Sequence, residues 1–272
     1  MSDWAIDREY LRYQYGDAEK LRVRQESHAR YSENPGDFFE WVLSHADLRP
    51  GLVVVDIGCG PGAYHPLLCR QGVRVIGLDF SWGMVREARR GAEERRLEVW
   101  VAQADAQALP LPDVCCDRVM ANHMLYHVPD QLRALREMRR VLRPDGRVIL
   151  ATNAADTNER LARLHAEAAQ SLGYRVTKAM SARFTLDDLP LVRKVFPNAR
   201  VYVREDAFLF PDVDSALRYY ASGMIDRIEE LPADGSHRPR LLALMEERIR
   251  EIIAREGIFR VPKSAGCFVA EV

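Results

Sequence analysis

The feature that most constrains the fold is a short apolar run that ends at a cluster of glycines. Residues 52–57 read LVVVDI, and glycines follow at positions 58, 60 and 62. A run this short and this rich in β-branched residues predicts a buried parallel strand. Glycines permit positive φ angles and let a ligand lie against bare backbone, while the start of a following helix offers free N–H groups to a carboxylate or a phosphate. The segment therefore predicts a strand, a ligand-binding loop and a helix in succession.

Strands and helices alternate over the residues that follow. Further strands are expected at residues 73–79, 97–102, 118–121 and 147–152, and helices at 81–95 and 130–142. The second helix is expected to end in a turn at Arg143 to Gly146, because proline and glycine interrupt helices. This alternation predicts the α/β class, with a Rossmann-like doubly wound parallel sheet.

The flanking segments lack this alternation. Residues 3–47 are expected to be helical with a break at Asn34 to Gly36, and later helices are expected at 157–172, 186–195, 212–223 and 238–256. Strands are expected at 200–210 and 266–272. The pattern predicts four parts: an N-terminal helical lid segment at 1–48, a ligand-binding core at 49–154, a helical insertion at 155–199, and edge strands with an inserted helical cap at 200–272.

Composition excludes several classes of protein. With 272 residues, of which 47% are hydrophobic and 29% charged, the chain can bury a substantial core. A net charge of -1 gives no global field for binding nucleic acid. The 5 cysteines form no CxxC pair and no cluster with histidine, so neither a disulfide framework nor a metal site is expected. Without a leader or a long apolar run, the sequence predicts a soluble cytoplasmic protein.

Three aspartates at or just after the ends of successive strands discriminate between ligands. The glycine spacing also fits the dinucleotide fingerprint, but the charge of Asp56 would repel a pyrophosphate and could instead interact with an ammonium group, directly or through water. A carboxylate at Asp79 can accept both hydroxyls of a ribose, and one at Asp105 can accept the exocyclic amine of adenine. Each has a plainer explanation, since Asp also caps helices and favours turns. Together they match S-adenosylmethionine better than NAD.

These segments resemble the class I S-adenosylmethionine-dependent methyltransferases, particularly the small-molecule group related to the ubiquinone and menaquinone biosynthesis enzymes. The resemblance covers roughly residues 50–152, and it rests on VDIGCGPG at 55–62, GLDFSWGM at 77–84, ADAQALP at 104–110, DRVMANHMLYHVPD at 117–130 and RPDG at 143–146. It implies a seven-stranded sheet whose last strand is antiparallel, so that residues 200–210 and 266–272 should pair at its edge.

The resemblance also implies a role for each matching residue. Gly58, Gly60 and Gly62 would border the methionine end of the cofactor, and Asn122 would lie beside the methionine moiety. Asp79 would bind the ribose. Phe80 and Met84 would touch adenine, while Asp105 and the Ala106 N–H would hydrogen-bond to its edge. Cys59 belongs to the same loop, where its side chain is a small apolar filler rather than a nucleophile, because no base accompanies it. The sequence departs from the family pattern at Trp82-Gly83 and at Cys115-Cys116, and neither departure affects a cofactor contact.

His123 and His127 are the candidates for a catalytic role. They would share one face if the segment from Asn122 onward were helical, at the end of the fourth strand where α/β enzymes place substrate. No third ligand accompanies them, so no metal is expected. A base is needed only if the acceptor must lose a proton. His127 could alternatively serve only to orient the segment, while His123 points toward substrate.

The sequence predicts an S-adenosylmethionine-dependent methyltransferase that transfers a methyl group to a small-molecule acceptor by in-line displacement. Neither a nucleic-acid partner nor a membrane is expected, and the oligomeric state is left open. A nucleic-acid methyltransferase is one alternative, which a basic, aromatic-lined surface would favour. A non-catalytic regulator that binds S-adenosylmethionine is another, and the motifs do not distinguish it. Asp56 and Asp105 disfavour a nicotinamide oxidoreductase.

Overall fold

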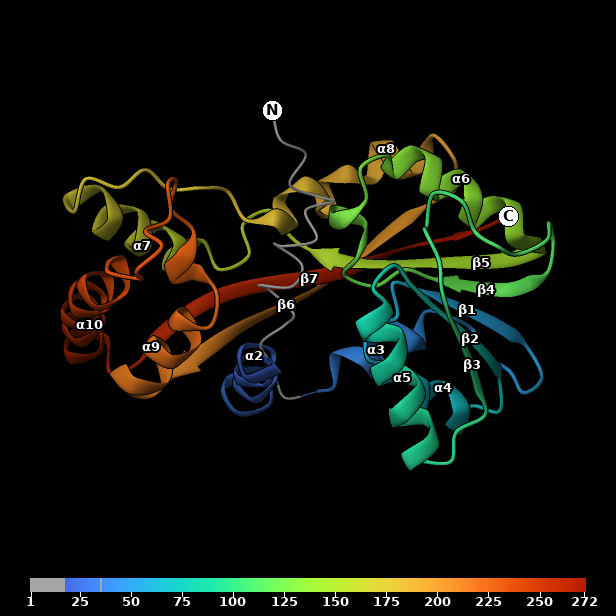
Figure 1. Ribbon diagram of the computed structural model, residues 1–272, viewed down its shortest axis with the longest axis horizontal. Coiled ribbons are helices and arrows are strands. Elements are labelled where there is room, and N and C mark those ends of the chain that lie inside the picture. The colour runs from blue at the N-terminus through green and yellow to red at the C-terminus, as the bar shows by residue number, and fades with distance from the viewer. Residues whose placement is uncertain (1–17, 35) are drawn as a thin grey trace. The chain divides into compact units, whose positions relative to one another are not determined.

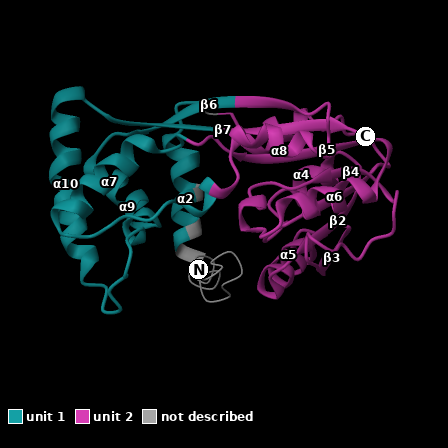
Figure 2. Ribbon diagram, turned by 90° about the horizontal axis from the view of Figure 1, so that it is seen from above, with its two compact units in different colours: residues 1–35, 156–182, 204–264 teal, residues 36–155, 183–203, 265–272 magenta. Residues whose placement is uncertain are grey.

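The computed structural model describes residues 18–34 and 36–272, and it is drawn in Figure 1. The part of the expected lid segment at residues 1–17 lies outside the described residues. The chain divides into two compact units, coloured in Figure 2. Unit 1 comprises the described residues of Met1–Pro35, Asp156–Ala182 and Arg204–Ser264, and unit 2 comprises Gly36–Ala155, Arg183–Val203 and Ala265–Val272.

The strands form one seven-stranded sheet in the order β3-β2-β1-β4-β5-β7-β6. They are β1 (Val53–Ile57), β2 (Arg74–Asp79), β3 (Val99–Gln103), β4 (Cys116–Met120), β5 (Leu142–Asn153), β6 (Arg200–Phe210) and β7 (Phe259–Glu271). The first five pair in parallel, and β7 pairs with β5 in the antiparallel direction. This confirms the predicted sheet, with β7 longer than the strand expected from the sequence.

Helices cover both faces of the sheet in unit 2 (Figure 1). One face carries α3 (Phe38–Ser44), α4 (His65–Arg70) and α5 (Trp82–Glu94), and the other carries α6 (Gln131–Val141) and α8 (Leu189–Arg193). On β1, Val53 and Val55 pack with the α6 side, while Val54 packs with the α3 and α4 side. Both faces of this strand are therefore buried, as its continuous apolar run predicted.

Local capping explains where the predicted helices begin. The side chain of Ser81 accepts the Met84 N–H at the start of α5, and Asp130 accepts the Arg133 N–H at the start of α6. Both are residue types that stabilise a helix N-terminus.

The predicted turn at residues 143–146 lies inside the beginning of β5 rather than before it. Cys116 pairs with Leu142, but Arg118 pairs with Arg147, so the extra residues of β5 form a bulge. Asp145 has a φ of 64° within it. The proline and glycine do interrupt the helix as expected, and the chain re-enters the sheet at once.

Unit 1 is mainly helical. It contains α2 (Ala18–Tyr31), α7 (Glu159–Ser171), α9 (Val213–Ala221) and α10 (His237–Glu256), with parts of β6 and β7. Short 3-10 turns occur in both units: Leu125–His127 and Leu186–Asp188 lie in unit 2, Met224–Asp226 lies in unit 1, and Met180–Arg183 lies at the boundary between them in the sequence. A separate apolar core in unit 1 includes Tyr220, Leu241 and Met245. Within the described ranges, no helix combines the length and the apolar character needed to cross a membrane.

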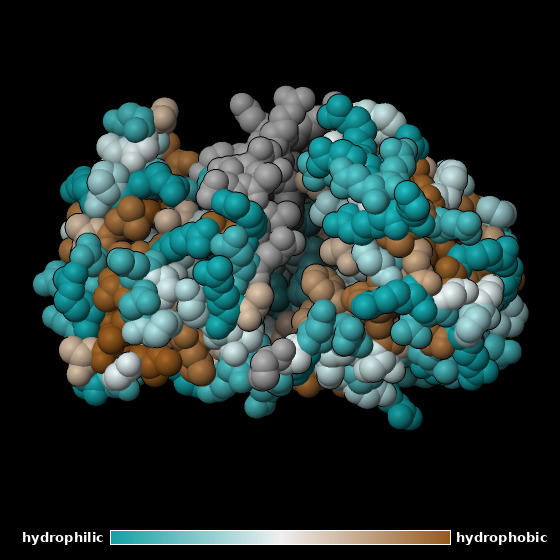
Figure 3. All heavy atoms as spheres, turned by 90° about the horizontal axis from the view of Figure 1, so that it is seen from below, coloured by the Kyte–Doolittle hydropathy of each residue, from teal (hydrophilic) through white to brown (hydrophobic). Residues whose placement is uncertain are grey.

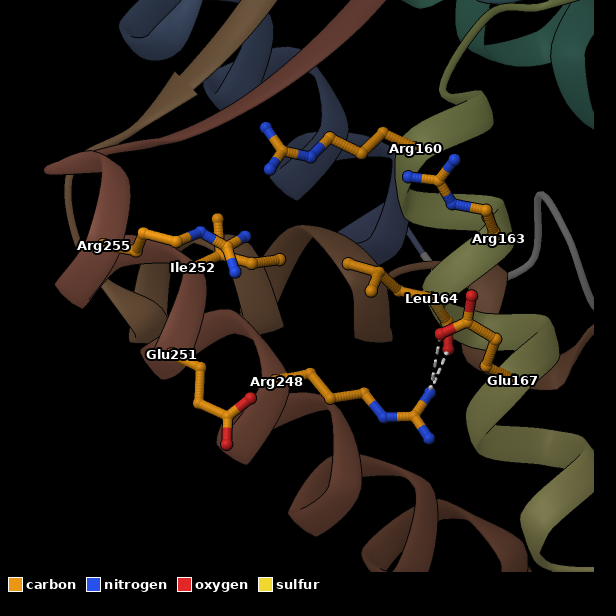
Figure 4. Close-up of a pocket in the computed structure, with 8 residues that line it drawn as sticks. All are labelled: Arg160, Arg163, Leu164, Glu167, Arg248, Glu251, Ile252 and Arg255. Atoms are coloured by element: carbon orange, nitrogen blue, oxygen red, sulfur yellow. Dashed lines mark hydrogen bonds and ion pairs between the residues drawn. The ribbon is translucent and has the colours of Figure 1, made fainter.

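A groove between α7 and α10 of unit 1, with a volume of about 460 Å³, is shown in Figure 4. Its arginines largely have carboxylate partners: Arg248 lies 3.6 Å from Glu167, and Arg160 lies 2.8 Å from Glu256. Leu164 and Ile252 also line it. The pairing of charges along the groove is typical of a solvated interface between two helices.

The buried guanidinium of Arg118 ties the segment after α3 to the sheet. Its side chain is 8% exposed, and it donates to the Ala46 carbonyl at 2.6 Å and to the Asp47 carbonyl at 2.8 Å. Arg118→Met should lower the free energy of unfolding by about 2 to 4 kcal/mol, because both carbonyls lose a charged donor. Urea unfolding followed by tryptophan fluorescence measures this in unit 2, which holds Trp41, Trp82 and Trp100.

Arg49→Met is the matched control for Arg118→Met. Arg49 also pairs with Asp47, but its side chain is 72% exposed, so the change should cost less than about 0.5 kcal/mol. Equal losses for the two variants would contradict the structural role of Arg118.

Candidate cofactor site

The loops that follow β1, β2 and β3 are tied together at one edge of the sheet. Gly58 and Cys59 donate their backbone N–H groups to the Leu78 carbonyl at 2.7 and 3.0 Å, and the Ala104 N–H donates to the Asp79 carbonyl at 3.0 Å. Parallel pairing places the carboxyl ends of these strands side by side, and α/β proteins bind ligands at such an edge. The structure therefore brings together the glycine loop and the residues predicted to bind the cofactor after β2 and β3.

The glycine loop needs its glycines for conformation and, in part, for space. Gly58, Gly60 and Gly62 have φ angles of 67°, 55° and 83°. A Cβ on Gly58 would lie 2.6 Å from the Cβ of Met124, in the segment that follows β4. A Cβ on Gly60 would meet nothing within 4 Å, which leaves open space beside that backbone. A ligand can therefore approach the loop at Gly60 without displacing protein atoms.

Asp79 anchors the glycine loop from the end of β2. One carboxylate oxygen accepts the Gly60 N–H at 2.9 Å, and the other accepts the Ser81 N–H at 2.8 Å. Each oxygen keeps a second lone pair that a ligand hydroxyl can use. Burial raises the pKa of Asp79 above its ordinary value, despite the two backbone donors. Further donors from a ligand would compensate for this loss of solvation.

The residues after β3 form turns instead of a helix. Asp105 accepts the backbone N–H of Gln107 at 2.8 Å, an arrangement that closes a turn, and the adjacent Ala106 is 7% exposed.

Phe80, which directly follows β2, is 44% exposed. On the face shown in Figure 3, hydrophobic residues are interspersed with hydrophilic ones.

Three side chains of α6 fasten the loop that carries Asp105. Glu137 accepts the Leu109 N–H at 2.9 Å, Arg140 donates to the carbonyls of Leu109 and Leu111 at 3.1 and 2.8 Å, and Arg133 donates to the Gln107 carbonyl at 2.8 Å. Glu137 and Arg140 also pair at 2.7 Å. Sequence reasoning missed this function. The only signal was the spacing of an acidic and a basic residue by three positions on one helix, which is common on any exposed helix.

Asn122 offers an unused hydrogen-bond donor at the end of β4. Its Oδ1 accepts the Ala151 N–H at 3.3 Å, while Nδ2 is buried and has no partner among the described residues. A buried donor without an acceptor is costly and uncommon. A polar group of a ligand at this position would satisfy it.

The segment with the two candidate catalytic histidines is not an α-helix. His123 has a φ of 53°, and only Leu125–His127 forms a 3-10 turn. The left-handed residue prevents a helix from starting at Asn122, so the helical spacing argument for a shared face was wrong. Burial lowers the pKa of His123 and of His127 to about 4. Both imidazoles are therefore neutral near pH 7, and the His123 ring lies 5.6 Å from the ring of Phe38.

Asp56 and Cys59 lie below the loop surface. Asp56 is 2% exposed, and its Oδ2 lies 3.5 Å from Nε2 of His65, a residue that sequence reasoning did not single out. Cys59 is 8% exposed, and burial, with the charges of Asp56 and Asp79, raises the pKa of its thiol. Over residues 18–34 and 36–272, no group of three or more histidine, cysteine, aspartate or glutamate side chains is arranged to hold a metal.

Glu137→Gln tests how the loop after β3 is held. The hydrogen bond from Arg140 is the main cause of the lowered pKa of Glu137, so the carboxylate stabilises the fold above its ordinary pKa of 4.5. This contribution is lost as the pH falls through the lowered pKa of the folded state. At pH 7 the variant should lose about 1 to 2 kcal/mol of unfolding free energy. Urea unfolding from pH 7 to below 4.5 should show this difference shrinking, and a constant difference would contradict it.

Comparisons with known proteins agree with the geometry. A family described as "Methyltransferase domain" matches residues 55–150. The methyltransferase GfsG of Streptomyces halstedii is 37% identical over 115 residues, which are 41% of each chain. The demethylmenaquinone methyltransferase of Bacillus cereus (strain B4264) is 26% identical over 194 residues, covering 68% of this chain and 75% of that protein. The chain thus spans less than half of the length of GfsG.

A solved structure extends the comparison to the fold. The crystal structure of a SAM dependent methyltransferase from Aquifex aeolicus matches with a TM-score of 0.51 at 20% identity, over 69% of this chain and 90% of that one. At this identity the likeness shows the fold alone. The positive-φ glycines, the anchored Asp79 and the orphaned Asn122 donor fit the functional groups of S-adenosylmethionine. Residues 55–150 therefore match a methyltransferase domain, and the chain resembles the class I S-adenosylmethionine-dependent methyltransferases.

Proposed function

We propose that this protein transfers the methyl group of S-adenosylmethionine to a small molecule. The observation that carries the proposal is the placement of Asp79, whose carboxylate holds the Gly60 N–H at 2.9 Å and keeps lone pairs for a ribose. S-adenosylmethionine contains both a ribose, which could bind Asp79, and an amino-acid end, which could lie along the glycine loop.

The proposed cofactor contacts follow the edge of the sheet. Asp79 binds the ribose hydroxyls; Gly58, Cys59, Gly60 and Gly62 border the methionine end; Phe80 and Met84 touch adenine; Asp105 and the Ala106 N–H read its edge; and Asn122 lies beside the methionine moiety. The free Nδ2 of Asn122 supports the last contact. Asp56, at 2% exposure, can act on the ammonium group only from beneath the loop.

The bound cofactor supplies an electrophilic methyl group on a sulfonium. The residues of this chain therefore have to orient the acceptor in line with that carbon and to exclude water. His123 and His127 are the proposed catalytic residues for an acceptor that loses a proton, such as a hydroxyl. Burial lowers the pKa of each imidazole to about 4, which keeps both neutral near pH 7 with a free lone pair but makes each a weaker base than an exposed histidine.

The small size of the acceptor is supported by two observations. One matching relative is named a demethylmenaquinone methyltransferase, and the net charge of -1 offers no general attraction for a polyanion. We assign recognition of the acceptor to the lid segment at 1–48, the insertion at 155–199 and the cap within 200–272. The five free cysteines support a cytoplasmic location.

Asp79→Ala tests the cofactor site. Loss of the charged acceptor should weaken binding of S-adenosylhomocysteine by about 1.5 to 3 kcal/mol, or roughly 10- to 150-fold, in isothermal titration calorimetry. Glu94→Ala is the control, because that carboxylate is 64% exposed on α5, and it should leave affinity unchanged. Wild-type protein that binds NADH but neither S-adenosylmethionine nor S-adenosylhomocysteine would refute the assignment.

The protonation state of His123 can be measured without knowing the acceptor. With its pKa lowered to about 4 by burial, the imidazole should stay neutral as the pH falls from 8 to 5. Nitrogen-15 NMR of the histidine rings should show this signal unchanged over that range, and its absence in His123→Gln identifies it. Titration near 6.5 would show an exposed imidazole and remove the basis for a buried base.

A further inference from the structure

A buried histidine and a buried carboxylate lie close together beneath the glycine loop. His65, the first residue of α4, and Asp56, near the end of β1, are each 2% exposed. Their Nε2 and Oδ2 atoms are 3.5 Å apart, and neither atom makes a hydrogen bond to any described residue. Burying polar atoms without hydrogen bonds is costly, and their closeness to each other offsets only part of that cost. The fold therefore maintains a costly arrangement beneath a loop that is proposed to contact the cofactor.

The imidazole of His65 also fills the space that two glycines leave. A Cβ on Gly62 would lie 2.5 Å from Nδ1, and a Cβ on Gly77 would lie 2.9 Å from Cε1. Gly62 belongs to the loop, and Gly77 belongs to β2, where it pairs with Asp56 of β1. Gly77 is not among the glycines with positive φ, so its lack of a side chain serves the close approach of the ring rather than the backbone conformation.

These contacts join the parts that shape the loop. The imidazole of His65 lies against the Asp56 carboxylate of β1, the backbone of β2 at Gly77 and the backbone of the loop at Gly62. The backbone N–H of His65 also donates to the Gly62 carbonyl at 3.1 Å. Because well-packed interiors do not deform continuously, removing the ring would let the loop settle into another shape. The Asp56 Oδ2 would also lose the imidazole nitrogen that lies 3.5 Å from it.

We propose that His65 is a positioning residue for the cofactor, which holds the glycine loop and the Asp56 carboxylate in the geometry that binds S-adenosylmethionine. The inference rests on the proposed function, since it concerns the same loop. His65 touches no ligand in this assignment, and it acts through Asp56, Gly62 and Gly77.

A double-mutant cycle tests the proposal, with calorimetric affinity for S-adenosylhomocysteine as the readout. His65→Ala and Gly77→Ala should each weaken binding about tenfold, the first by releasing the loop and the second by forcing a methyl group against the ring. In the His65→Ala background the added methyl group no longer meets the ring, and the nearest remaining atom is the Cys59 Sγ at 3.2 Å, so the double variant should bind within about twofold of His65→Ala alone. If the double variant showed the product of the two single losses of affinity, the proposal would be overturned. It would also be overturned if neither single variant lost affinity.

Two further variants separate positioning from simple stability. His65→Gln keeps an N–H donor for Asp56 and should retain more affinity than His65→Ala, whereas equal loss would overturn the role of the pair. His237→Ala removes a comparable buried pair from unit 1, where His237 lies 2.9 Å from Asp226. It should lower the melting temperature and leave the affinity unchanged.

The outcomes also distinguish this inference from the proposed function. If wild-type protein binds no S-adenosylhomocysteine, the cofactor assignment itself fails. If wild-type protein binds and the cycle is additive, only the role of His65 fails. If His65→Ala does not fold, Gly77→Ala still decides the matter, because unchanged affinity in that variant would contradict contact between ring and strand.

Discussion

The parallel pairing of β1 with β2 and β4 is the constraint on which the site depends. It places three polar chain ends at one edge, so that a backbone N–H of the glycine loop meets the carboxylate of Asp79 at 2.9 Å. The buried valines of β1 contribute to both faces of the sheet. Hydrophobic burial thus fixes the strands, and the strands fix the positions of the polar groups at their ends.

Around this edge, polar contacts replace the packing that a regular helix would give. The turns after β3 are fastened by Glu137 and Arg140 of α6, and the glycine loop rests on His65. Both devices use side chains that do not face the proposed ligand. Precision at the site therefore depends on side chains outside the proposed set of cofactor contacts.

Local signals accounted for most of the fold. Apolar runs, the caps at Ser81 and Asp130, and the glycines at 58, 60 and 62 are encoded within a few residues, so strands, helix starts and loop were predictable. The bulge in β5 was not, because it arises from register with β4, a distant partner. The left-handed conformation of His123 was missed for a related reason, since its N–H bonds to Ala151 across the sheet.

Strand β7 makes the sheet of unit 2 depend on pairing between distant parts of the sequence. Its residues from Ala265 onward belong to unit 2, yet they follow Arg204–Ser264 of unit 1 in the chain. The partner of Arg147 on β5 is Glu271, so this pair can form only after the intervening segments have been brought together. Pairing between such distant segments is slow, and until it forms β5 keeps an open strand edge. An unpaired strand edge invites association with other chains, so folding is most exposed to misassembly before β7 docks.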